Sequence, residues 1–159
     1  MMTANTNYKP EDSISVHYPE AVEWRRALHK CPQPSWLEFF ATAFVAEKLA
    51  GWGYDVKQGR DVIAEEKLLL LPDPETLQAE YDRALKAGAN EKFLAPARGG
   101  FTGLVAVLKG DLPGPTMGFR FDIDSNEVTE ASDKAHLPAR EGFLSQNPGY
   151  AHMCGHDIH

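Results

Sequence analysis

The residues with the greatest capacity for chemistry lie together at positions 152–159, which read His-Met-Cys-Gly-His-Asp-Ile-His. This segment holds three of the six histidines and one of the two cysteines. A thiolate and imidazoles at this spacing are typical ligands of a divalent transition metal. Gly155 lets the backbone bend between Cys154 and His156, which do not share a helix face, so the pair predicts a loop site. Asp157 could hydrogen-bond the free ring nitrogen of a liganding histidine.

Asp122 and Asp124 form a second group of candidate residues, because they follow the apolar stretch 116–121, which predicts a buried strand. Carboxylates at the end of a buried strand mark the usual ligand-binding edge of α/β sheets. In a regular strand the two side chains point to opposite faces, so at most one would face the site directly. The alternative is that both aspartates are turn or capping residues.

The two groups together contain the parts that hydrolysis of an amide by metal-bound water requires. A metal lowers the pKa of its bound water and polarises the carbonyl, while nearby carboxylates orient ligands and move protons. We therefore predict that Cys154 and His156 approach Asp122 or Asp124 in space, across the irregular stretch 125–151. The alternative is a histidine-rich tail that binds metal only adventitiously, because two or three ligands do not close a site.

Several helices and strands are predicted to position these residues. The clearest is a helix at 35–52, with a wide apolar face and a capping box formed by Ser35 and Glu38. Strands are predicted at 54–57, 102–108 and 116–122, and a further helix begins at Asp73 and Pro74. We expect the strands 102–108 and 116–122 to pair in one sheet, covered by the helix 35–52.

A first helix is predicted to begin near Tyr18 and to end before Pro32. His29 follows the apolar face of this helix and has no nearby ligand in the sequence. We expect it to be a hydrogen-bonded structural histidine rather than a metal ligand. Residues 1–16 are polar and predict a loose N-terminal arm, which leaves 17–159 as one domain.

The composition is that of an ordinary globular chain of 159 residues, with 43% apolar and 25% charged residues. A net charge of −7 argues against nucleic acid as a partner. No apolar run approaches the ~20 residues of a membrane span, so no membrane association is expected. Cys31 and Cys154 lie in unlike contexts and make a weak case for a disulfide, which favours a reducing, cytoplasmic compartment.

Several short stretches resemble one group of metal-dependent amidohydrolases. These are the hippurate-hydrolase-like and auxin-conjugate-hydrolase-like members of the aminoacylase and glutamate-carboxypeptidase metallopeptidase family. The resemblance covers most of residues 20–159, and the Cys-Gly-His-Asp motif is its most specific part. The stretches occur in the family's order: 26–29, 103–110, 114–116, 120–124 and 152–157.

The resemblance implies a two-metal site on an α/β domain. Cys154 and His156 match positions that are metal ligands in the family. Asp124 would take a supporting catalytic role, and Asp122 and Asp157 would support the ligands without binding the metal themselves. In the family, the general base and the remaining ligands come from an adjacent pair of glutamates and from later histidines. These positions are absent from the 159 residues, and no role is implied for Glu130 or His159.

The fold implied is the N-terminal part of a metallopeptidase-type catalytic domain, with a central sheet flanked by helices. A smaller lid or dimerisation domain would be absent, and the chain would be truncated within its metal-binding motif. The resemblance also implies hydrolysis of an N-acyl or aminobenzoyl amino acid, such as aminobenzoyl-glutamate, with Mn or Zn as cofactor. It is compatible with a homo-oligomer or a related partner subunit, and the fragment by itself should be inactive. The alternative is a non-catalytic remnant that serves as a metal-binding or subunit-interaction module.

Overall fold

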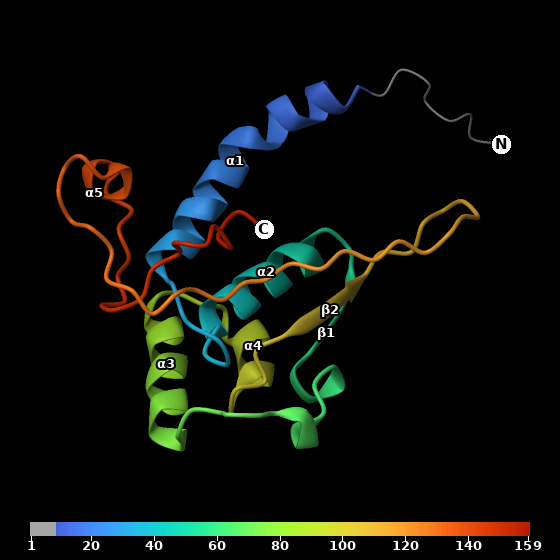
Figure 1. Cartoon of the computed structure of the whole chain (residues 1–159). Helices are drawn as coiled ribbons and strands as arrows, with labels where there is room; N and C mark the ends of the chain where they lie inside the picture. The colour runs from blue at the N-terminus through green and yellow to red at the C-terminus, as the bar shows by residue number, and fades with distance from the viewer. Residues whose placement is uncertain (1–8) are drawn as a thin grey trace.

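The computed structural model describes residues 9–159, in which helices pack on a small two-stranded sheet (Figure 1). The longer elements are α1 (Pro10–Lys30), α2 (Phe39–Gly51), β1 (Asp55–Gln58), α3 (Pro74–Lys86) and β2 (Leu104–Val107). Two short helices, α4 (Glu91–Leu94) and α5 (Leu137–Glu141), complete the set, together with 3-10 turns at Gly59–Asp61, Glu65–Lys67 and Ala95–Ala97. Helices and a sheet in one chain agree with the predicted α/β class.

Helix α2 lies at the centre of the molecule and contacts α3, α4 and both strands. Its apolar face supplies much of the core, as the helical spacing of the sequence predicts. The ring of Phe39 meets that of Tyr81 on α3 edge to face, with centroids 5.7 Å apart. The buried cluster consists of Leu37, Phe39, Phe40, Ala43, Leu77, Tyr81, Ala84, Ala89, Leu94 and Ala97.

The predicted start of this helix is wrong, because α2 begins at Phe39 and the capping box does not form. Trp36 adopts a left-handed φ of 67°, and this turn separates Ser35 from the helix. The Ser35 hydroxyl donates instead to Asp124, and the Glu38 carboxyl accepts from the Thr102 hydroxyl. Long-range partners therefore replace the local bonds of a capping box.

The strand predicted at 102–108 is confirmed over Leu104–Val107, but its predicted partner is wrong. β2 pairs antiparallel with β1, with Asp55 opposite Val107 and Gln58 opposite Leu104. Residues 116–122 form no strand. After β2 the chain swings out in a long protruding loop (Figure 1), and residues 109–124 make no backbone–backbone hydrogen bond within the described part of the chain. A strand cannot form without such a ladder.

The N-cap of α3 is as predicted: the Asp73 carboxylate accepts from the Thr76 backbone N–H at 2.9 Å, and Pro74 occupies the first turn. α1 begins at Pro10 rather than near Tyr18, so part of the segment expected as a loose arm is helical. Residues 1–8 of that arm lie outside the described residues. None of the described helices has the length and apolar character needed to cross a bilayer.

Candidate functional site

A pair of backbone hydrogen bonds brings the two groups of candidate residues together. Asn126 and Ala151 form an isolated antiparallel bridge, each donating its N–H to the other's carbonyl at 3.0 Å. The bridge closes the irregular stretch 125–151 at its base, so Asp124 on one side lies near 152–157 on the other. Gly155 has a φ of 82° in this segment, which is a loop with the expected bend.

Cys154 and His156 both approach Asp124, as predicted. Nδ1 of His156 lies 2.8 Å from Oδ1 of Asp124 and 3.2 Å from its carbonyl oxygen. Sγ of Cys154 lies 4.0 Å from the same carbonyl oxygen and is exposed. A histidine ring held through Nδ1 by a carboxylate leaves its Nε2 available to a metal. The sequence predicts that supporting role for Asp157, whereas the structure places Asp124 there.

Asp122 also reaches this cluster, together with the last residue of the chain. One ligand atom each from Asp122, His156 and His159 lies within 4.8 Å of the others, so the three could hold a metal ion. The expectation that only one of the two aspartates faces the site is wrong, because 122–124 is not a regular strand. No sequence pattern predicts a role for His159, whose ring lies 4.9 Å from that of His156 between centroids.

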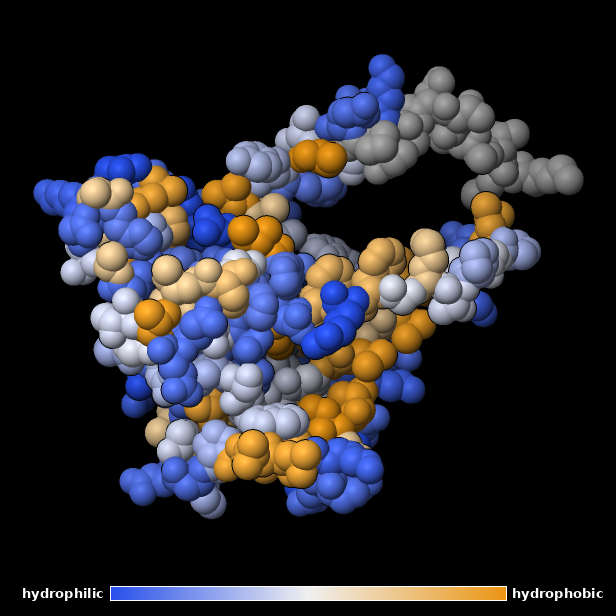
Figure 2. Space-filling model, in the orientation of Figure 1, coloured by the Kyte–Doolittle hydropathy of each residue, from blue (hydrophilic) through white to orange (hydrophobic). Residues whose placement is uncertain are grey.

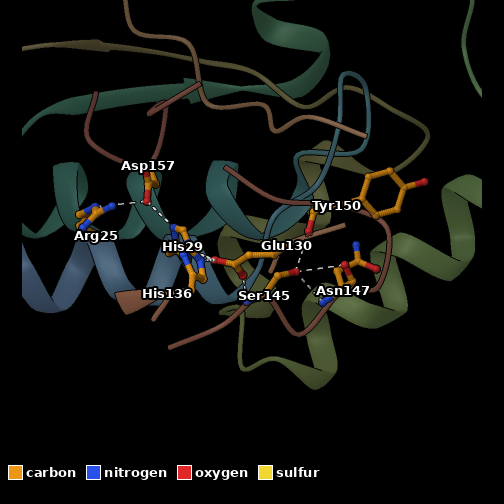
Figure 3. Close-up of polar contacts among 8 residues, drawn as sticks. All are labelled: Arg25, His29, Glu130, His136, Ser145, Asn147, Tyr150 and Asp157. Atoms are coloured by element: carbon orange, nitrogen blue, oxygen red, sulfur yellow. Dashed lines mark hydrogen bonds and ion pairs between the residues drawn. The ribbon is translucent and has the colours of Figure 1, made fainter. Parts of the chain in front are cut away.

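Behind the cluster, His29 is buried between two carboxylates (Figure 3). Nδ1 lies 2.7 Å from Oδ2 of Asp157, and Nε2 lies 2.7 Å from Oε1 of Glu130. Burial opposes a charge on the ring, but the two hydrogen bonds outweigh it and raise the pKa of His29. His29 is therefore a hydrogen-bonded structural histidine, as the sequence predicts. Its two hydrogen bonds connect α1 to the stretch 125–151 and to the segment 152–159.

The two carboxylates beside His29 have further partners. Asp157 also pairs with Nε of Arg25 at 3.3 Å, and Glu130 accepts from His136 and from the Ser145 backbone N–H, each at 2.7 Å. Burial opposes ionisation of both acids, but their hydrogen bonds lower the pKa of Glu130 and of Asp157. The sequence implies no role for Glu130, since its partner His29 lies 101 positions away on α1.

Two further titratable groups lie beside the site, and the sequence predicts no role there for either of them. Burial raises the pKa of Glu38 to about 7 despite the Thr102 hydrogen bond, and the charge of Asp124 contributes to the rise. Burial lowers the pKa of His152 to about 4, so its ring is neutral at pH 7. Nδ1 of His152 is buried with no hydrogen-bond partner in the described part of the chain. The sequence pattern assigns Glu38 to a cap, and it places His152 in the histidine-rich segment 152–159 without giving it a role.

Comparison with known proteins confirms the resemblance. The chain is 45% identical over 141 residues to indole-3-acetyl-aspartic acid hydrolase of Enterobacter agglomerans, and 44% identical over 141 residues to one subunit of the p-aminobenzoyl-glutamate hydrolase of Escherichia coli. Each match covers 89% of this chain and 32% of the relative, so the chain spans about a third of their length. It is also 29% identical to N-acetyldiaminopimelate deacetylase of Exiguobacterium sibiricum, over 87% of this chain and 25% of that protein. No family model matches the chain.

A solved structure has a similar fold over most of this chain. The crystal structure of aminobenzoyl-glutamate utilization protein from Klebsiella pneumoniae superposes with a TM-score of 0.70 at 40% identity, over 73% of this chain and 29% of that one. This agrees with the predicted metallopeptidase-type α/β fold. The chain is a homologue of these hydrolases, matched to them over part of their length.

Proposed function

We propose that this chain, a homologue of the aminobenzoyl-glutamate and indole-3-acetyl-aspartate hydrolases, supplies one side of a metal-dependent amidohydrolase site. The observation that carries the proposal is the convergence of Cys154 and His156 on Asp124. Residues that lie apart in the sequence meet there, as a site built from separate segments requires. The substrate class proposed is an N-acyl or aminobenzoyl amino acid, such as p-aminobenzoyl-glutamate, because relatives carry these names.

The side chains present fit a divalent metal of the Mn or Zn type. A thiolate, imidazoles and a carboxylate are an acceptable ligand set, with Cys154 and His156 as the proposed ligands. The group whose ligand atoms lie within 4.8 Å of one another consists of Asp122, His156 and His159, and Cys154 lies outside it. When bound, the metal would supply an activated water and polarise the amide carbonyl. The family's second metal would need ligands beyond those described here.

The protein's own residues would orient the ligands. Asp124 accepts a hydrogen bond from Nδ1 of His156, which fixes the ring's tautomer and direction. The Ser35 hydroxyl donates to the other oxygen of Asp124 at 3.2 Å and so limits its rotation. Asp157, held by His29, fixes the position of the segment that carries both ligands. The general base is proposed to come from elsewhere in the hydrolase, as the family pattern implies.

The proposal also covers the protein's partners and its cellular compartment. Because the name of the Escherichia coli relative describes one subunit of a hydrolase, we include a related partner subunit or a homo-oligomer. Cys31 and Cys154 are both free, which fits a reducing, cytoplasmic compartment. A non-catalytic metal-binding or subunit-interaction module is the second candidate. It is favoured by the extent of exposed apolar surface beside the site.

Titration with Co²⁺ tests the metal site, because a thiolate ligand gives Co²⁺ an intense near-ultraviolet absorption. We expect this absorption with the unchanged chain and with Cys31→Ala, which alters the chain's other free cysteine. Cys154→Ala should abolish the band. Equal spectra for the unchanged chain and Cys154→Ala would contradict the proposed ligand set.

A further inference from the structure

A cavity of about 390 Å³ lies between the 3-10 turns that follow β1, the start of α3 and the segment 98–101. This volume is within the range of small-molecule sites in proteins. None of its lining residues belongs to the candidate metal site. In Figure 1 the start of α3 lies at the lower end of the molecule, whereas the end of the chain lies above α2. The cavity is therefore separate from the candidate metal site.

One wall of the cavity is apolar. This apolar wall consists of Leu68, Leu71, Pro74 and Leu77. Gly100 makes it possible, because its φ is 88° and an added Cβ would lie 2.7 Å from Cδ2 of Leu71 and 3.2 Å from Cδ2 of Leu77. Figure 2 shows hydrophobic surface at the lower end of the molecule, where the chain leads into α3. A wall of this kind suits the apolar part of a ligand.

Two guanidinium groups line the same cavity, and each lies over an aromatic ring. Cζ of Arg60 lies 4.0 Å from the centroid of the Phe101 ring, and Cζ of Arg98 lies 4.0 Å from that of the Tyr81 ring. Both rings are buried, so they give the two arginines fixed supports. A ring beneath a guanidinium contacts its face and leaves the N–H donors at its edges available. Both arginines are therefore held in place and still able to bind an anion.

Most of these donors have no partner in the described part of the chain. Each guanidinium carries a fork of several N–H donors, and the hydrogen bonds made are one from Arg60 to Glu65 at 3.4 Å and one from Arg98 to Gln78 at 3.3 Å. Two arginines and one glutamate give the lining a net charge of +1, in a chain of −7. The Tyr81 hydroxyl is buried and has no hydrogen-bond partner in residues 9–159. The cavity thus offers donors and positive charge to an anion.

We propose that this cavity binds a small aromatic carboxylate, with the carboxylate held by Arg60 and Arg98 and the ring against the apolar wall. The planar fork of a guanidinium matches the two oxygens of a carboxylate. A monoanion balances the net charge of the lining. An aromatic ring covers apolar surface that an inorganic anion such as phosphate would leave in contact with water. The inference does not depend on the proposed function, because the cavity shares no residue with the metal ligands.

The alternative is that the two arginines only cover apolar surface. A long cationic side chain can lie along an aromatic ring for that reason alone. This explanation accounts for each stacked pair, but it gives no reason for two guanidinium groups and an apolar wall to line one cavity. The two explanations differ in whether the charge of an added ligand matters.

Calorimetric titration of the metal-free chain with benzoate tests the inference. We expect a dissociation constant of about 1 mM or below, which a ligand of this size can reach. Benzamide has nearly the same shape without the charge, and it should bind more weakly by about tenfold or more. Inorganic phosphate has the charge without the ring and should also bind more weakly than benzoate. Equal binding of benzamide or of phosphate would contradict an aromatic carboxylate as the ligand.

Matched variants locate the binding site. Arg60→Gln and Arg98→Gln change exposed side chains, and each should weaken benzoate binding by about tenfold or more. Arg140→Gln makes the same change of charge at an exposed arginine outside the cavity and should leave binding unchanged. Backbone amide NMR signals of 98–101, rather than those of 152–157, should shift on titration. Absence of benzoate binding, binding that neither cavity variant alters, or shifts confined to 152–157 would each overturn the inference.

Discussion

At the residue scale, the charge on His29 has a direct effect on how the stability of the fold depends on pH. Both ring nitrogens face carboxylates at 2.7 Å, and a histidine ring donates from both nitrogens only when it is protonated. The folded state thus binds a proton that the unfolded state releases more readily. The same contacts lower the pKa of Glu130 and of Asp157.

The pH dependence of stability follows from these directions. The raised pKa of His29 gives stability that is complete below its ordinary value of 6.5 and is lost as pH rises through the folded value. The lowered pKa values of Glu130 and Asp157 give stability that is present above 4.5 and 3.8 and is lost as pH falls. The contributions of His29, Glu130 and Asp157 to the free energy of unfolding in urea are therefore complete together only at about pH 5–6. The lowered pKa of His152 adds a loss of stability as pH falls below 6.5, and the raised pKa of Glu38 adds a loss as pH rises above 4.5.

Replacement of His29 tests this assignment. His29→Gln removes the cation that two buried carboxylates share and leaves Asp157 with Arg25 and Glu130 with His136, so the free energy of unfolding at pH 6 should fall by about 3 kcal/mol. The part of the loss of stability above pH 6.5 that comes from His29 should also disappear, so the free energy of unfolding should fall less steeply there than in the unchanged chain. The control is His17→Gln, which changes an exposed histidine of α1. An unchanged pH profile in His29→Gln would show that another group governs the loss at high pH.

Asp124 offers a second test at this scale. Because it holds Nδ1 of His156, Asp124→Asn should reduce affinity for Zn²⁺ by about 10- to 100-fold while the ligands remain in place. Isothermal calorimetry measures this, with Asp55→Asn on the exposed face of β1 as the matched control. If the two variants bound Zn²⁺ with equal affinity, Asp124 would have no role in supporting the site.

At the element scale, Gly59 directly follows β1 and packs against the turn at Ala95–Ala97. Its φ is 61°, and a Cβ added there would lie 2.2 Å from the carbonyl oxygen of Pro96. Both the backbone conformation and this close approach require glycine. Gly53 has a similar φ of 84°, but nothing lies within 4 Å of its added Cβ.

The two glycines form a matched pair for mutation. Gly53→Ala should cost only the conformational penalty, about 1 kcal/mol. Gly59→Ala adds a clash with backbone and should cost at least about 3 kcal/mol. Urea unfolding measures both values. Equal losses would mean that the Pro96 segment moves freely away from β1.

At the scale of the whole molecule, residues 1–159 should not hydrolyse p-aminobenzoyl-glutamate or hippurate, even with added Mn or Zn. General acid–base assistance contributes roughly 10²–10⁴-fold, and the proposed base lies elsewhere in the hydrolase. The assay is product release, compared with Cys154→Ala. Metal-dependent turnover that this substitution abolishes would show that the 159 residues form a complete site.

The sequence by itself determined the features that depend on near neighbours. The apolar spacing of α2, the Asp73 cap of α3 and the bend at Gly155 involve residues within a few positions of one another. The Cys154-Gly155-His156-Asp157 motif and the acidic pair after 116–121 likewise led to the prediction that Cys154 and His156 approach Asp122 or Asp124. For these features the local pattern carries enough information.

Only the tertiary structure decided which distant segments meet. β2 pairs with β1 rather than with 116–122, because a ladder needs a neighbouring backbone and the loop after β2 leads the chain away from the sheet. Ser35 and Glu38 form long-range bonds to Asp124 and Thr102 in place of a local cap. His29 reaches Glu130 and Asp157 across more than a hundred positions, which no local pattern encodes. Burial and packing across the whole chain select these contacts, because their partners become neighbours only after the elements have assembled.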